Sequence, residues 1–60
     1  MWTVVFVTDV YNEAINIKNN LENESLKVRV KKRISEGLEP EVFEILVPDA
    51  EVSFALAQVS

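Results

Sequence analysis

"EVFEILVPDAE", residues 41 to 51, is the stretch that decides the fold. Within it, "VFEILV" carries apolar side chains on both parities, which is typical of a central strand buried on both faces. Pro48 suits the first turn of a helix, where its missing N–H costs nothing, and Asp49 and Glu51 complement the helix dipole. The stretch therefore predicts a strand at 41–47 that leads directly into a helix at 49–58.

The residues before this stretch predict two more strands and one more helix. "WTVVFV", residues 2–7, is β-branched or aromatic throughout and indicates a strand. Asp9 is then expected to be the N-cap of an amphipathic helix at 10–23, because apolar residues recur there at helical spacing, at Val10, Ala14, Ile17 and Leu21. Residues 26–33 alternate apolar and basic side chains, the pattern of a strand with one buried face.

The order strand, helix, strand, strand, helix restricts the topology. A right-handed crossover makes the first two strands parallel, and a hairpin through residues 35–40, which hold the only glycine, folds the third strand back. We expect one α+β domain over residues 1–60: a βαββα unit with strand order 1-3-2 and both helices on one face, a ferredoxin-like arrangement without its last strand. The expected core is Val4, Phe6, Ala14, Ile17, Leu21, Val28, Val30, Phe43, Ile45, Val52, Leu56 and Val59.

Three segments carry a resemblance to a known family. "MWTVVFV" at the start, "ENESLKVRV" after the first helix and above all "EILVPDAE" at 44–51 resemble a small bacterial family described as signal-transducing proteins of unknown function. The resemblance implies a βαββα fold and a bacterial, cytoplasmic setting. It implies no ligand, activity or functional residues, because none is established for the family.

Composition argues against catalysis and against bound cofactors. The chain has no cysteine and no histidine, so the usual ligand sets for zinc, haem and iron–sulfur clusters are missing, as are the side chains that most often catalyse reactions at neutral pH. The only glycine, Gly37, cannot form a glycine-rich phosphate loop. The acidic groups Glu22 and Glu24, and Glu36, Glu39 and Glu41, match no calcium-loop spacing and are interpreted as solvated. We expect no enzyme, no cofactor and no metal.

The basic segment "KVRVKKR", residues 27–33, is the sharpest candidate for a binding site. It carries +5, whereas the rest of the chain has one lysine against ten acids, which gives -9 and a total of -4. Lys27, Arg29 and Lys31 are expected to point away from the helices into solvent. One interpretation is a charged edge that discourages unwanted strand pairing. The alternative is a site for RNA or an anionic partner, formed by Lys27, Arg29, Lys31, Lys32 and Arg33.

Self-association is predicted from apolar residues that the core cannot cover. Ala50, Phe54 and Ala57 form a second apolar strip on the last helix. The first strand is expected to be an edge without charged side chains, and Val5 and Val7 are expected on its uncovered side near Val42 and Leu46. A two-fold homodimer would cover these surfaces, by pairing of the first strands or by the Phe54 strip against the open sheet face.

The functional expectation is a small interaction or regulatory module that acts by binding. Its expected partner is a second copy of itself, with another protein as a second kind of partner and nucleic acid not favoured. The apolar start lacks a preceding basic segment and is too short to span a membrane, so we expect a cytoplasmic protein without a membrane anchor.

Overall fold

The computed structural model describes residues 1–34, 37 and 41–59, and these form the expected succession of elements. The hairpin expected at 35–40 lies outside the described residues, apart from Gly37. Among the described helices, none is long and apolar enough to cross a membrane. The elements are β1 (Trp2–Thr8), α1 (Tyr11–Asn23), β2 (Arg29–Arg33), β3 (Val42–Pro48), a 3-10 turn η1 (Asp49–Glu51) and α2 (Val52–Val59).

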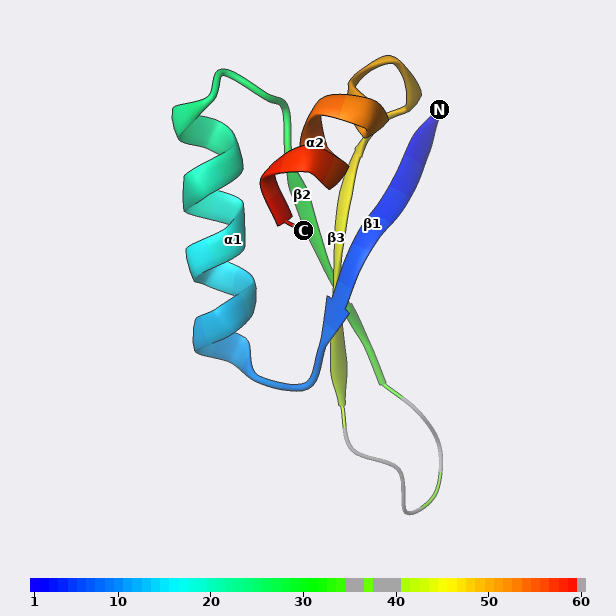
Figure 1. Cartoon of the computed structure of the whole chain (residues 1–60). Coiled ribbons are helices and arrows are strands. Elements are labelled where there is room, and N and C mark those ends of the chain that lie inside the picture. The colour runs from blue at the N-terminus through cyan, green and yellow to red at the C-terminus, as the bar shows by residue number, and fades with distance from the viewer. Residues whose placement is uncertain (35–36, 38–40, 60) are drawn as a thin grey trace.

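The strand order of the described sheet is β1-β3-β2, which confirms the predicted topology (Figure 1). β3 is antiparallel to both neighbours, so β1 and β2 run parallel to each other, as the crossover through α1 requires. β1 and β2 are the two edges, and β3 is central because its residues are apolar on both faces. β2 is shorter than predicted, since it begins at Arg29 instead of Leu26.

Both helices pack on one face of this sheet, around five described residues that are fully buried. Ile45 and Val47 of β3 form this core with Ala14 and Leu21 of α1 and with Ala55 of α2. Of the predicted core residues, Val4 and Leu56 are exposed, at 40% and 46%, whereas the others are buried or half-buried. Ala55 is the residue of α2 that is fully buried, and Leu56 lies about 100° around the helix axis from it. Leu56 therefore points away from the core, and α2 contacts the sheet along a narrower stripe than predicted.

An irregularity in β1 explains the exposure of Val4. The register with β3 shifts between Val4 and Phe6, so that Val4 pairs with Leu46 whereas Phe6 pairs with Ile45. An extra residue at a bulge breaks the period-two alternation. Val5, predicted on the uncovered side, therefore packs against the core, and Val4, predicted in the core, lies on the uncovered side.

The ends of α1 also differ from the sequence-based expectation. The N-cap position is Val10, with no side-chain cap, so the prediction that Asp9 caps the helix is wrong. The hydroxyl of buried Thr8 instead accepts a hydrogen bond from the Val10 N–H at 3.1 Å. This bond fixes the turn from β1 into α1.

The C-terminus of α1 closes in a Schellman motif. The Leu26 N–H donates to the Leu21 carbonyl at 3.1 Å, and the Ser25 N–H donates to the Glu22 carbonyl at 2.9 Å. Ser25 takes the left-handed position with φ 66°, which glycine fills at lower cost. The motif turns the chain back so that Leu26 packs against the core before β2 starts.

Three hydrogen bonds anchor the beginning of the last helical segment. The Asp49 N–H donates to the Met1 carbonyl at 3.0 Å, and the Thr3 hydroxyl donates to the Asp49 carboxylate. The Glu51 carboxylate accepts a hydrogen bond from the Lys27 N–H at 3.2 Å. η1 is thereby tied both to the start of β1 and to the segment before β2, which places α2 over the sheet.

Candidate binding face of the sheet

The face of the sheet opposite the helices is the candidate functional surface. Paired residues of neighbouring strands point to the same side, so the register determines which side chains share this face. Neither α1 nor α2 packs on it, because both helices lie on the other side of the sheet (Figure 1). We call this surface the open face, and its members are Trp2, Val4, Val7, Arg29, Lys31, Arg33, Val42, Glu44, Leu46 and Pro48.

The five predicted basic site residues do not share one surface. Arg29, Lys31 and Arg33 pair with Leu46, Glu44 and Val42, and they form a row on the open face. Lys32 pairs with Phe43 and lies on the helix side, where its ammonium is 3.3 Å from a Glu41 carboxylate oxygen. Lys27 precedes the strand. All of the trio Lys27, Arg29 and Lys31 are exposed, as predicted, but Lys27 lies outside the row because β2 starts later than expected, and Arg33 completes the row.

Trp2 is a site residue that the sequence did not reveal. The guanidinium carbon of Arg29 lies 4.2 Å from the centre of a Trp2 ring, a cation–π geometry. Trp2 is in β1 and Arg29 is in β2, so Arg29 reaches across β3 to make this contact. Sequence reasoning found no aromatic side chain within the basic strand, and only the strand order brings one beside it.

One carboxylate lies among the cations of the open face. Glu44 is 7% exposed, and its Oε2 accepts a hydrogen bond from Arg33 Nη2 at 2.9 Å. This ion pair neutralises the charge at one end of the basic row. Arg29 and Lys31 are left without a recorded carboxylate partner among the described residues, so the remaining positive charge is concentrated on these two side chains.

Beside the cations lies a row of aliphatic side chains. Val4 and Val7 of β1 are 40% and 52% exposed, and Val42 and Leu46 of β3 are half-buried. Scattered exposed valines are ordinary, but here Val4 is paired with Leu46 of the neighbouring strand, and cations of β2 lie on the other side of β3. The open face is thus a strip of aliphatic surface along β1 and β3, interrupted by Glu44 and crossed at one end by Arg29, with a basic margin along β2.

The residues predicted for self-association fall on two separate surfaces. Ala50, Phe54 and Ala57 are exposed in the η1–α2 segment, and Phe54 is 68% exposed. Val7 lies on the open face, on the other side of the sheet. Val5 contributes to neither surface, since it packs against the core.

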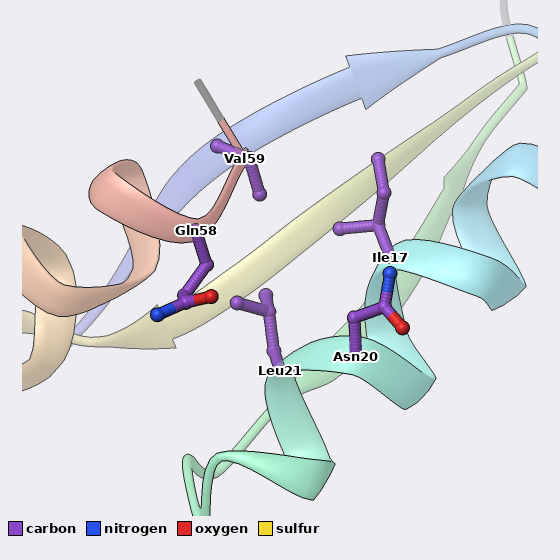
Figure 2. Close-up of a pocket in the computed structure, with 5 residues that line it drawn as sticks. All are labelled: Ile17, Asn20, Leu21, Gln58 and Val59. Carbon is purple, nitrogen blue, oxygen red and sulfur yellow. The ribbon is translucent and has the colours of Figure 1, made fainter.

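A small pocket lies between the two helices, on the covered side of the sheet (Figure 2). Its volume is about 150 Å³, whereas clefts for drug-sized ligands typically hold about 300–1,000 Å³. The side chains around it are apolar or amides, with no ionisable group: Ile17, Asn20, Leu21, Gln58 and Val59. The pocket has room for water or a very small molecule, and it has no acid, base or nucleophile at its wall.

The described residues bring together no group of three acidic side chains that could hold a metal ion. Within that part of the chain, three acidic residues predicted to be solvated are exposed, namely Glu22, Glu24 and Glu41. Oε1 of Glu22 is 2.8 Å from Nζ of Lys18. Glu36 and Glu39 lie outside the described residues. The described side chains of the open face are cations, one aromatic ring, aliphatic groups and the paired carboxylate of Glu44.

Comparison with family models, with curated proteins and with solved structures found no match to this chain. The resemblance to the bacterial family of signal-transducing proteins stays a prediction from the sequence.

Proposed function

We propose that this protein is a small non-catalytic interaction module and that the open face is its binding surface. The observation that carries the proposal is the contrast between the two sides of the sheet. One side is covered by α1 and α2, while the other presents exposed Val4 and Val7 beside the cations Arg29 and Lys31. A surface of this kind gains free energy when a partner covers its apolar part and supplies negative charge.

The proposal of binding without catalysis rests on the available side chains. The chain has no histidine or cysteine, and the buried carboxylate of Glu44 is held by Arg33 at 2.9 Å. The pocket between the helices is lined by aliphatic and amide groups alone. A regulatory role through association with another molecule uses the groups that the open face does present.

RNA binding through the basic strand is the second candidate function. The observation in its favour is Trp2, because bases stack on aromatic rings next to basic side chains in many single-strand binding surfaces. The net charge of -4 and the aliphatic character of the remaining face weigh against it.

The proposal is tested by mapping binding on the amide spectrum of the isotope-labelled protein. The protein is titrated in turn with an acidic amphipathic peptide, a single-stranded oligouridylate and inorganic phosphate. We expect at least one probe to shift the amides of β1, β3 and β2 around Val4, Val7 and Lys31, and to leave the outer side of α1 unchanged.

A matched pair of variants controls this assignment. Val7→Glu places a charge on the open face, whereas Phe54→Glu places one on the helix side, and both positions are more than half exposed. We expect Val7→Glu to weaken binding of the active probe and Phe54→Glu to leave it unchanged. If no probe shifts the open face, or if the shifts cluster on α1 and α2, the proposed function is wrong.

A further inference from the structure

The open face has two parallel stripes of different chemistry, and their arrangement indicates the kind of partner. The aliphatic stripe runs along β1 and β3 and is interrupted by Glu44. Lys31 borders it along β2, and Arg29 extends from β2 across β3 to the Trp2 ring at one end of the stripe. Resting on the proposed function, we propose that the open face receives an amphipathic α-helix of another protein, with its apolar side on the aliphatic stripe and acidic residues along one flank.

The dimensions of the sheet suit one helix of moderate length. β3 has seven residues, so the central strand is about 24 Å long at about 3.4 Å per residue. A helix lying along it would present about 15 residues at 1.5 Å each. Arg29 and Lys31 are two residues apart on one strand, so their Cα atoms are about 7 Å apart, while acidic residues one helical turn apart have Cβ atoms about 5–6 Å apart. The Arg29 guanidinium, at the Trp2 ring, lies farther over the sheet than the Lys31 backbone.

Covering this face would also complete the layering of the domain. A sheet is stable when each apolar face is buried against another element, and α1 and α2 cover only one face. Val4 and Val7, at 40% and 52% exposure, are the side chains that a third helix would bury. The partner helix would thus repeat on the open face the packing that the chain's own helices make on the other.

The same face is poorly suited to a second copy of this chain. Stacking two open faces about a two-fold axis along the strands sets each basic row opposite the partner's Trp2, Val4 and Val7. An axis across the strands sets one basic row opposite the other. The only carboxylate among the described residues of this face, Glu44, is already paired with Arg33, so neither arrangement supplies anions to Arg29 and Lys31.

Single-stranded nucleic acid would satisfy the cations but leave the aliphatic stripe without a matching surface. Bases gain affinity by stacking on aromatic rings, and the described part of the open face offers one such ring, Trp2, which is half-buried and already covered on one side by Arg29. An acidic amphipathic helix matches both stripes at once.

Trp2 provides the readout, since it is the only tryptophan of the chain and lies on this face beside Arg29. The probe is a peptide of about 15 residues with leucines along one side and glutamates along one flank. We expect a saturable change in tryptophan fluorescence on titration. A peptide with lysines in place of the glutamates is the control, and it should not bind.

Two neighbouring lysines give a matched pair of protein variants. Lys31→Glu reverses a charge on the open face, and Lys32→Glu makes the same change one residue later on the helix side. We expect Lys31→Glu to weaken peptide binding about tenfold or more, and Lys32→Glu to change it less than about twofold. Circular dichroism verifies that both variants are folded, and Lys31→Gln replaces Lys31→Glu if the latter is not.

Each outcome decides between the partners. Absence of saturable binding of the acidic peptide, or equal losses from the two lysine variants, overturns the inference. Binding of oligouridylate to the open face in place of the peptide overturns the inference but leaves the proposed function intact. Failure of every probe to affect the open face overturns both.

Discussion

The contact between Trp2 and Arg29 should contribute measurably to stability, and its size can be estimated. The guanidinium carbon lies 4.2 Å from the ring centre, inside the limit of about 6 Å for a cation–π interaction. Arg29 is exposed and Trp2 is half-buried, so the contact belongs at the solvent-exposed end of the range, about 0.5–1 kcal/mol. In a domain of this size, that free energy corresponds to a shift in melting temperature of about 2–8 °C.

A double-mutant cycle isolates this contribution. Urea unfolding of the parent protein, Trp2→Leu, Arg29→Gln and the double variant is followed by circular dichroism, because the cycle removes the tryptophan fluorophore. We expect a coupling free energy of about 0.5–1 kcal/mol between the two positions. The control cycle pairs Trp2→Leu with Lys31→Gln, which should be additive because Lys31 lies opposite Glu44, not over the ring.

Additivity of the Trp2 and Arg29 variants within about 0.3 kcal/mol, or equal coupling in the control cycle, would refute a stabilising cation–π contact between the two side chains. Additivity would mean that the ring and the guanidinium gain nothing from their contact. Equal coupling would mean that removal of Trp2 disturbs the whole open face.

The remaining predictions concern the core, a turn, an ion pair and an exposed helix. Leu21→Ala removes a fully buried side chain and should lower the free energy of unfolding by about 2–5 kcal/mol. This is a large part of the roughly 3–9 kcal/mol total expected for a domain of this size. A melting temperature equal to that of the parent protein would contradict the prediction. Ser25→Gly removes the side chain at the residue with φ 66° and should raise the free energy of unfolding by about 0.5–1 kcal/mol, seen as a higher melting temperature. A lower melting temperature would contradict backbone strain at Ser25. Arg33→Gln leaves the carboxylate of Glu44 unpaired; because Arg33 is 66% exposed, we expect a loss of only about 1 kcal/mol in urea unfolding, most of which Glu44→Gln should restore. We also propose self-association through the exposed Phe54, so Phe54→Glu should lower the sedimentation coefficient at high protein concentration. If the parent protein and Phe54→Glu both sediment as monomers, the proposal is wrong.

The candidate site was only partly visible in the sequence. The alternation of residues 28–31 correctly predicted that Arg29 and Lys31 lie on the open face while Val28 and Val30 pack against the core. Successive side chains of a strand point to opposite faces of the sheet. Lys27 is exposed as predicted but lies before β2 and not in it, since the Schellman turn and Leu26 delay the start of the strand. Trp2 was missed because a contact across a central strand depends on strand order and register, not on sequence distance.

Local sequence determined the element types and, through two general rules, the topology. The apolar run of 42–47 required burial on both faces and hence a central strand, and the crossover and hairpin connections then left one strand order. These features follow from short-range patterns that every residue in an element shares, so a single sequence is enough to read them.

Tertiary structure alone decided which side chains share the open face. The bulge between Val4 and Phe6 exchanged the sides of Val4 and Val5, and it depends on how β1 fits against β3, which no pattern within β1 records. The register of β2 on β3 set Lys31 opposite buried Glu44 and Arg33 opposite Val42, and Arg33 reaches Glu44 diagonally to form the ion pair. A one-residue difference in either register would move these groups to the other face, because strand side chains alternate with a period of two, and the candidate site exists only through that alignment.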